Sequence, residues 1–508
     1  MKSTFRFFLI LTTVTTAFVS NVIAQDTVLD MRVRGRLDSI HSSILDQERL
    51  IQVFTPKDYK TGSADKYDVL YVLDGGNWNT GMLNNIQYFV ENEGSMPPTI
   101  VVSVLGIDRN KDLTPTHTLN SKTSGGGKNF LAFIKNELVP YINKNYPSNG
   151  DNTLWGHSLG GMFVIYALLN EPSLFKSYIA VDPSIWWDHC LVARMAGEKL
   201  PSLTDEQRTL FISGREDGVK DMRIDTMEIV LKKSAPANLL WKMNVYADET
   251  HSSVRLKTTY DAFKFTYAGL TNNLQFHPMN GIVLKDKPFK IFYFDDTART
   301  HYTTDGTIPT LSSPQVLREI SVNGPLTVSY KRFSNRSSHD ILTTGIFTTE
   351  KFAAPLTKQK NLQSGGLNYS YYEGDWDSLP DFKNIQPVKT GITDKDFEPN
   401  KFPRKKNYAL MIDGMIESKE DGYYIFYLEA DKGSKLYLGN KLLMEWDGNY
   451  IKRTYTFIIP LSKGFYPVRV EYLCKNPDFN LSWGYITPSN MADKNAKPVP
   501  IELQYNKK

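Results

Sequence analysis

The sequence predicts an α/β fold, built on a doubly wound, mostly parallel sheet, with two all-β modules behind it. Three observations lead to this prediction. Apolar runs of strand length alternate with helix-like patterns from residue 25 to residue 270. From 271 to 350, short strand-like runs are broken by Gly, Pro, Asn and Asp. From 360 to 505, the chain is rich in Tyr, Trp and Gly and alternates with period two, as half-buried strands do.

The first region supplies the strands and helices of the predicted sheet. Strands are expected at the apolar runs 69–73, 99–105, 177–181, 210–212 and 241–245. The first two runs are continuously apolar, which is typical of strands buried on both faces of a parallel sheet. Residues 129–142 carry apolar side chains at helical spacing. In such a sheet, functional residues are expected at the carboxyl ends of the strands.

Changes in composition along the chain predict the domain boundaries. The segments are a signal peptide at 1–24, an α/β domain at 25–270, a small β module at 271–350, a linker at 351–364 and a β-sandwich at 365–508. The linker prediction rests on Pro355 and the polar residues around it.

The amino terminus resembles a secretory signal. Lys2 and Arg6 precede an apolar stretch that is too short to span a bilayer, and small residues up to Ala24 suit cleavage after that residue. We therefore expect a periplasmic or secreted protein without a membrane span. The formal net charge of +4 in 508 residues is too small to indicate a nucleic-acid partner. Cys190 and Cys474 fall in different predicted domains, so two free thiols are expected.

Residues 156–160 read Gly-His-Ser-Leu-Gly and match the G-x-S-x-G turn, which lifts a serine out of a strand at the start of a helix. The preceding residues 153–155 resemble the end of a buried strand, and the following residues 161–169 resemble an apolar helix. This context favours Ser158 as a nucleophile over a coincidental turn.

A serine nucleophile needs a general base and an acid that orients it, in the chain order Ser, acid, His. His251 is the predicted base because it follows the last predicted strand in a polar loop, and His189 is the weaker alternative. For the acid, Asp217 is favoured over its neighbour Glu216, and Asp182 at the end of another strand is the outsider.

Acyl transfer also needs hydrogen-bond donors for the oxyanion. The backbone N–H of Leu159 is the first expected donor, and that of Gly76, in the glycine turn after residue 73, is the second. Trp186 and Arg109 follow predicted strands and are candidate substrate-binding residues. Each has an ordinary alternative, Trp186 as core and Arg109 as a solvated loop residue. No cofactor and no metal are expected.

Several of these segments together resemble one group of α/β-hydrolases. They are 71–75, 109–115, 156–161, 182–187 and 251–253. The group contains siderophore trilactone esterases, feruloyl and acetylxylan esterases, and S-formylglutathione hydrolases. Members often place the acid third after a glycine, which by resemblance falls on Asp217 after Gly214. Some siderophore esterases work as a Ser-His pair, so the resemblance supports the acid least.

The carboxyl-terminal regions have resemblances of their own. Residues 302–310 are similar to a segment of the immunoglobulin-like module at the carboxyl terminus of chitobiases. Segments within 365–490 resemble the protective-antigen-type β-sandwich, whose calcium-dependent members use adjacent aspartates. Here the second position is Lys432, and an ammonium there opposes a calcium site. Any glycan binding is then expected from aromatic surfaces such as Trp376 or Trp446, unless both belong to the core.

The sequence as a whole predicts a serine carboxylic-ester hydrolase that works through an acyl-enzyme. The resemblance of its β modules implies feruloyl or acetyl esters of carbohydrates as substrates, with polysaccharide binding by the last module. The first alternative is a ferric siderophore trilactone esterase. The second is a carbohydrate-binding or adhesion protein whose esterase domain is inactive, and the complete set of Ser158, Asp217 and His251 argues against it.

Overall fold

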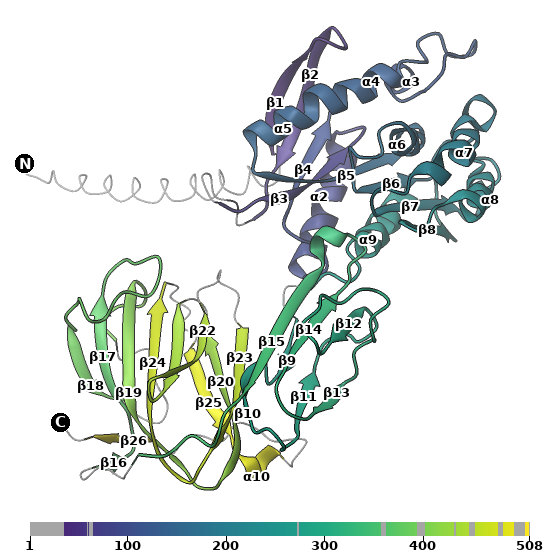
Figure 1. The fold of residues 1–508 in the computed structure, drawn as a ribbon. Coiled ribbons are helices and arrows are strands. Elements are labelled where there is room, and N and C mark those ends of the chain that lie inside the picture. The colour runs from purple at the N-terminus through teal and green to yellow at the C-terminus, as the bar shows by residue number, and fades with distance from the viewer. Residues whose placement is uncertain are drawn as a thin grey trace, which may run out of the picture. The chain divides into compact units, whose positions relative to one another are not determined.

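The structure is a computed structural model that describes most of the chain in two units (Figure 1). The described residues are 35–57, 59, 64–271, 274–356, 362–393, 402–430, 433–446, 453–475, 481–491 and 503–506. The predicted signal peptide and Lys432 lie outside these residues, so both predictions stay predictions. Within the described residues, no helix is long and apolar enough to cross a membrane.

Unit 1 comprises Met1–Asn272 together with Ser334–Asp340. Its sheet has the strand order β1-β2-β4-β3-β5-β6-β7-β8. The strands are β1 (Arg36–Ser42), β2 (Gln47–Phe54), β3 (Tyr67–Val72), β4 (Thr99–Val104), β5 (Ser148–His157), β6 (Ser177–Val181), β7 (Arg208–Arg215) and β8 (Leu239–Tyr246). The pairs from β4 to β8 along this order are parallel, and β2 is antiparallel to both of its neighbours. This confirms the predicted α/β-hydrolase sheet.

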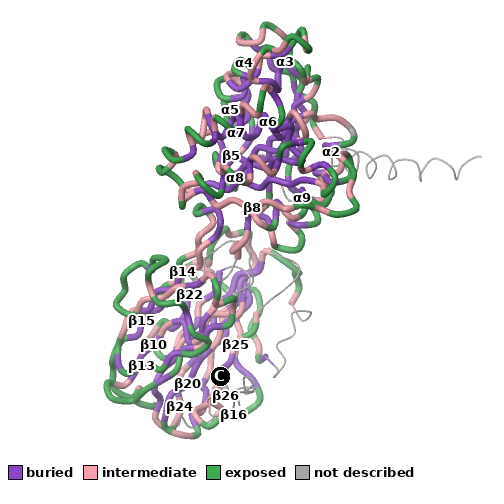
Figure 2. The backbone as a smooth tube through the Cα atoms, turned by 90° about the vertical axis from the view of Figure 1, so that its right-hand side faces the viewer, coloured by how far each residue is buried: buried purple, intermediate pink, exposed green. Residues whose placement is uncertain are grey.

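Helices cover both faces of this sheet, as a doubly wound fold requires. They are α2 (Asn77–Asn92), α3 (Arg109–Asp112), α4 (Gly127–Phe133), the π-helix η1 (Ile134–Leu138), α5 (Val139–Asn145), α6 (Leu159–Asn170), α7 (Trp187–Lys199), α8 (Ile224–Ser234) and α9 (Val254–Thr266), with short 3-10 turns η2 (Leu200–Ser202) and η3 (Glu216–Gly218). Alternate residues of β3 enter different cores, since Tyr71 packs with α6 and Val72 with α2 and α9. The inner strands β3, β4, β6 and β7 are buried between these two layers (Figure 2), whereas the edge strands β1 and β8 are partly exposed.

The order of the strands creates the crevice in which a site is expected. From β3 the chain passes to β4 on one side, and β5 then joins β3 on the other side. At such a switch point, the turns beyond the carboxyl ends of the two strands diverge to opposite faces and leave a crevice. The turn at Asp74–Gly76 follows β3 and the turn at Ser158 follows β5, so both lie at the place where the strand order predicts this crevice.

Unit 2 comprises Asn273–Phe333 and Ile341–Lys508 and consists of β-sheets. Its strands are β9 (Phe276–His277), β10 (Asn280–Val283), β11 (Phe289–Tyr293), β12 (Thr300–Thr303), β13 (Glu319–Val322), β14 (Leu326–Arg332), β15 (Ile341–Thr349), β16 (Leu362–Ser364), β17 (Asn368–Glu373), β18 (Lys389–Ile392), β19 (Tyr408–Ser418), β20 (Gly422–Ala430), β21 (Ser434–Leu438), β22 (Lys441–Trp446), β23 (Arg453–Leu461), β24 (Gly464–Cys474), β25 (Leu481–Ile486) and β26 (Leu503–Asn506). The short elements η4 (Ser337–His339), which belongs to unit 1, and α10 (Pro488–Met491) complete the described helices.

The two predicted β modules share one sheet. Its order is β12-β14-β15-β10-β23-β20-β25, so strands of the small module continue directly into strands of the sandwich. The joint is the parallel pair of β10 with β23, where a Cβ at Gly281 would overlap Ile458. Ala353, inside the predicted linker, forms a bridge with Leu461. The structure therefore joins segments that composition had divided at 350 and 365. Composition could not show this, because the pairing of strands that are distant in the sequence leaves no compositional signal.

Candidate functional site

The carboxyl end of β5 carries Ser158 on a strained turn. Its backbone has φ of 61° and ψ of −117°, a left-handed φ that costs free energy for a residue with a Cβ. A Cβ at Gly156 would overlap the carbonyl of Gly160, so the turn can close only because position 156 is glycine. The structure thus places Ser158 where a G-x-S-x-G turn presents a nucleophile, between β5 and α6.

Backbone and side-chain hydrogen bonds hold this turn against the segment after β6. The N–H of Ser158 donates to the carbonyl of Val181 over 2.9 Å, and the N–H of Ser184 donates to the carbonyl of Ser158 over 3.1 Å. The two hydroxyl oxygens lie 3.3 Å apart. Ser184 had no predicted role, although it lies in one of the segments that carry the family resemblance. It gives the Ser158 hydroxyl a defined neighbour.

His251 pairs with Asp182. The Nδ1 atom of His251 lies 2.6 Å from Oδ2 of Asp182, whose side chain is 0% exposed, whereas that of His251 is 39% exposed. Asp182 directly follows β6 with φ of 40°. With Nδ1 held by the carboxylate, Nε2 is the ring nitrogen left to exchange a proton.

Asp217, the favoured acid from the sequence, does not contact His251 and is corrected here to Asp182. Asp217 lies in η3, is 79% exposed, and pairs with Arg215 over 3.1 Å. Its neighbour Glu216 is exposed as well. Asp182, Glu216 and Asp217 all satisfy the expected chain order. They differ in the direction in which the side chain points, and the sequence of a loop at a strand end does not indicate that direction.

His157, beside the serine, supports the loop of His251. Its Nε2–H donates to the backbone carbonyl of His251 over 2.7 Å, and the two rings lie 4.4 Å apart. Burial, followed by the charge of His251, lowers the pKa of His157 to about 3. His157 is therefore neutral near neutral pH. The alternative base His189 lies in a run of left-handed residues at the start of α7, where its carbonyl accepts a hydrogen bond from Arg194.

The predicted oxyanion donors differ in their availability. Leu159 is the first residue of α6, so its N–H is among those that have no partner within the helix. The N–H of Gly76 instead donates to Oγ1 of Thr80 over 3.1 Å. That hydrogen bond is a local cap at the start of α2, and it engages the donor that the sequence assigned to an oxyanion.

The two predicted substrate-binding residues lie near the same crevice. Arg109 forms an ion pair with Asp74 and approaches the carbonyl of His157 over 3.4 Å. Burial raises the pKa of Asp74 despite the Arg109 charge. Trp186 is 45% exposed, while its neighbour Trp187 is buried and donates to Thr116. Trp186 thus offers an aromatic surface to solvent, and Trp187 belongs to the core.

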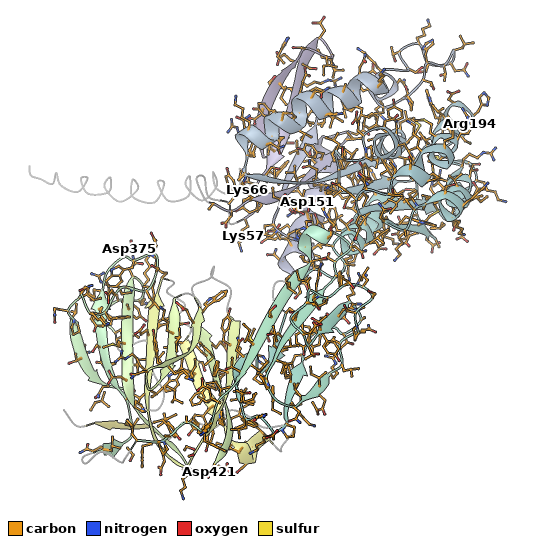
Figure 3. All side chains as sticks on the ribbon, viewed as in Figure 1. Lys57, Lys66, Asp151, Arg194, Asp375 and Asp421 are labelled. Carbon is orange, nitrogen blue, oxygen red and sulfur yellow. The ribbon has the colours of Figure 1, made fainter. Side chains whose placement is uncertain are left out.

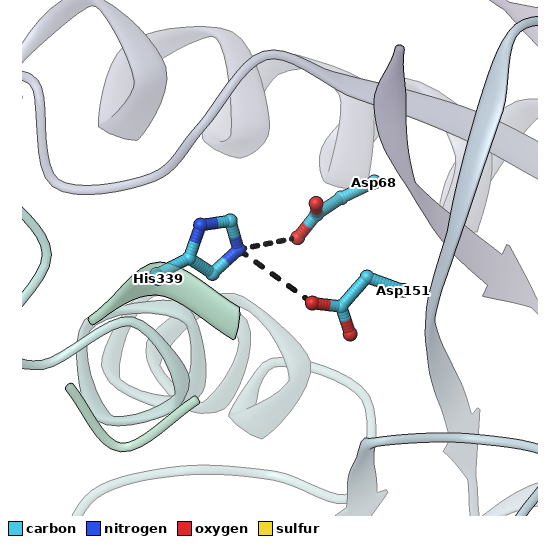
Figure 4. A group of neighbouring side chains, drawn as sticks. All are labelled: Asp68, Asp151 and His339. Atoms are coloured by element: carbon cyan, nitrogen blue, oxygen red, sulfur yellow. Dashed lines mark hydrogen bonds and ion pairs between the residues drawn. The ribbon is translucent and has the colours of Figure 1, made fainter. Parts of the chain in front are cut away.

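A second cluster of charged side chains lies at the opposite edge of the sheet. Asp68 begins β3, Asp151 lies near the start of β5, and His339 comes from the segment Ser334–Asp340 (Figure 4). Figure 3 shows that Asp151 lies far from Arg194 of α7 within unit 1. The Nε2 atom of His339 lies 3.0 Å from Asp68 and 3.8 Å from Asp151.

These three residues have the spacing of metal ligands, but Arg336 already supplies a cation. Its guanidinium forms an ion pair with Asp151 and lies 3.6 Å from Asp68. Arg336 is 1% exposed and stacks over the ring of Tyr267. A guanidinium between two carboxylates opposes a divalent ion in the same place. The donor set therefore fits an internal ion-pair network better than a metal site.

In unit 2, the two tryptophans proposed as glycan platforms are half-buried. Trp376 packs with Tyr372 and Leu379, and Trp446 lies against Tyr455 with ring centroids 5.1 Å apart. Each thus combines a core contact with an exposed part, so both interpretations from the sequence stay open.

Comparison with known proteins finds matches for two regions of the chain. Residues 42–251 match the family model described as "Putative esterase", and residues 363–502 match the PA14 domain. The siderophore enterobactin esterase of Emericella nidulans is 28% identical over 222 residues, covering 38% of this chain and 72% of that protein. The ferri-bacillibactin esterase of Bacillus subtilis is 29% identical over 167 residues, covering 28% and 56%.

Among solved structures, an IroE-like serine hydrolase from Shewanella oneidensis is similar at 29% identity. The match has a TM-score of 0.42 and covers 45% of this chain and 78% of that one.

Proposed function

We propose that the esterase-family region of this chain, residues 42–251, cleaves carboxylic esters through an acyl-enzyme on Ser158. The observation that carries the proposal is the convergence at one edge of the sheet. Ser158 follows β5, Asp182 follows the adjacent β6, and His251 follows β8 and hydrogen-bonds to Asp182. A strained serine, a partly exposed imidazole and a buried carboxylate are the parts of a nucleophile–base–acid set.

Each residue has a defined task in the proposed reaction. Ser158 Oγ attacks the carbonyl carbon while His251 Nε2 takes its proton, and Asp182 stabilises the imidazolium that forms. The N–H of Leu159 at the start of α6 donates to the oxyanion. His251 then gives its proton to the leaving alkoxide as the ester C–O bond breaks. Water repeats the sequence on the acyl-enzyme and releases the acid.

The proposed substrates are esters of the siderophore class. The Emericella relative is named a siderophore enterobactin esterase, and the Bacillus relative is named a ferri-bacillibactin esterase. Arg109, at the crevice and partly exposed, offers a cation to an anionic ligand. Acyl esters of carbohydrates, the first preference from the sequence, are the second candidate, and the PA14 match in unit 2 is the observation that favours them.

The deciding experiment measures kcat/KM of the full chain on a ferric siderophore trilactone, a feruloylated sugar and acetylated xylan. We expect the trilactone to be turned over most efficiently. Ser158→Ala is the matched control and should lose at least about 10³-fold in kcat. Preference for either carbohydrate ester supports the second candidate. No turnover of any ester, or equal turnover by Ser158→Ala, contradicts the proposed reaction and leaves the inactive-esterase alternative.

A further inference from the structure

One oxygen of the buried Asp182 carboxylate receives two donors of different kinds. Oδ2 accepts from Nδ1 of His251 at 2.6 Å and from Nε of Arg215 at 3.0 Å. The other oxygen, Oδ1, is buried without a hydrogen-bond partner among the described residues. The carboxylate is therefore oriented, and partly neutralised, by a guanidinium that competes with the imidazole for the same atom.

The local chain holds Arg215 in this position. Arg215 is the last residue of β7, and η3 folds back over it so closely that a Cβ at Gly218 would overlap the guanidinium. On its outer side, Nη1 of Arg215 donates to Asp217 over 3.1 Å. Burial lowers the pKa of Arg215, but the two carboxylates more than offset this and raise it overall. Arg215 thus stays charged and links the buried Asp182 to the exposed Asp217.

We propose that Arg215 is a positioning residue for the reaction proposed above. It fixes the Asp182 carboxylate toward His251 and compensates part of the negative charge that this carboxylate presents to the ring. Asp217 acts on the same site only through Arg215, because its charge partly compensates that of the guanidinium. The inference rests on the proposed function.

We attribute the effect on His251 to the Asp182–Arg215 pair and not to the other titratable or charged groups that face the ring. His157, packed against the ring from β5, is neutral near neutral pH because its pKa is about 3. Arg255 on α9 and Arg109 on α3 lie close enough to His157 for their charges to lower that pKa. Both are cations, as Arg215 is, but Arg215 is the cation that bonds directly to the acid of the pair.

The test is the pH dependence of kcat/KM of the full chain on an aryl ester. Removing the cation makes protonation of the base easier, so Arg215→Met should move the acidic limb to higher pH by about one unit. Arg215→Lys, which keeps the charge, should stay near the wild type. Asp217→Asn should move the limb in the opposite direction and by less, because Asp217 is exposed and screened. Glu216→Gln is the matched exposed control and should not move it.

A second readout separates this inference from the proposed function. The titration of the His251 ring, followed by NMR of 13C-labelled histidine and assigned with His251→Gln, should shift in the same directions whether or not the ester is turned over. An unchanged or downward-shifted limb in Arg215→Met, with active wild type, overturns the role of Arg215. Where Arg215→Met is insoluble, the direction of the Asp217→Asn shift decides. Loss of wild-type turnover contradicts the proposed function, and the NMR titration then decides on Arg215.

Discussion

Unit 1 builds Asp, His and Arg into clusters at both edges of its sheet, and the two clusters have opposite properties. At the carboxyl edge, His251 is partly exposed, one Asp182 oxygen has no partner among the described residues, and a serine is adjacent on a strained turn. At the amino edge, every oxygen of Asp68 and Asp151 has a donor. The cluster at the carboxyl edge, the open cluster, therefore leaves one carboxylate oxygen without a partner. The cluster at the amino edge, the closed cluster, pairs both carboxylates fully, although Nε of Arg336 has no partner there among the described residues.

The difference follows from what each network holds. The amino-edge network binds Ser334–Asp340, a segment that the chain reaches only after β14 and that belongs to unit 1. Arg336 donates to Thr153 and Tyr267, and Ser338 donates to Asp151. Paired buried charges are costly to break singly, because the remaining partner is left buried without compensation. In a network whose groups gain and lose protons, the donors and acceptors cannot all stay paired in this way.

The largest expected effect concerns the acid of the open cluster. Asp182→Asn should reduce kcat by about 10⁴-fold, because an amide cannot stabilise the imidazolium or hold the correct tautomer. Asp217→Asn should stay within about threefold of the wild type, since its charge is exposed and its partner is Arg215. Steady-state kinetics on an aryl ester measure both variants. The reverse ranking would return the acid to Asp217.

Disrupting the closed cluster should change the free energy of unfolding more than it changes catalytic activity. Arg336→Met leaves Asp68 and Asp151 buried without the guanidinium that pairs with both and should lower the free energy of unfolding of unit 1 by about 3–5 kcal/mol. Lys232→Met, which removes the exposed ion pair of Lys232 with Glu228 on α8, is the control and should cost about 1 kcal/mol or less. Urea denaturation followed by fluorescence measures both. Equal costs would mean that the buried network contributes no more than a surface pair.

The closed cluster also predicts a loss of stability in acid. Burial raises the pKa of Asp68, but the hydrogen bond from His339 and the charge of Arg336 outweigh it and hold that pKa below its ordinary value. A lowered folded-state pKa gives stability that is present above the unfolded value, about 3.9, and is lost as the pH falls through the folded value.

Asp68→Asn removes this dependence and tests it. The variant should be less stable at neutral pH by about 1–3 kcal/mol, and it should lose less stability than the wild type as the pH falls below 5. Melting temperatures measured from pH 7 to pH 3 give both slopes, with Glu216→Gln as the exposed control. Parallel slopes for wild type and Asp68→Asn would show that Asp68 does not couple folding to pH.

The smallest effect is expected at the exposed rim of the open cluster. Trp186→Ala should raise KM by about three- to tenfold, with little change in kcat, because an aromatic surface binds ground state and transition state alike. Trp187→Phe is a poor control, since Trp187 donates to Thr116 in the core. Trp78→Ala, at another exposed tryptophan of unit 1, is the better one. A change in kcat alone would place Trp186 nearer to the reacting atoms.

The sequence predicted the parts of the site that follow from local pattern. Ser158 was identified from its glycines and its position between strand and helix, and His251 from its place after the last strand; their catalytic roles stay predictions. Asp182 was only an outsider, because its direction toward His251 depends on a left-handed turn and on Arg215 closing from the next strand. The docking of Ser334–Asp340 onto unit 1 was not predicted, since it pairs residues more than 180 positions apart.

The close approach of β10 to β23 at Gly281 limits how this chain can be divided into fragments or recombined. Because β10 lies between β15 and β23, the small module and the region that matches PA14 both contribute strands to one continuous sheet. A fragment that begins near residue 360 would leave β23 with a bare edge of unpaired amides and carbonyls, a template for association with other chains. Recombination, whether in the laboratory or in evolution, therefore has to move residues 273–508 as a block, and this move takes from unit 1 the segment Ser334–Asp340 that packs in it.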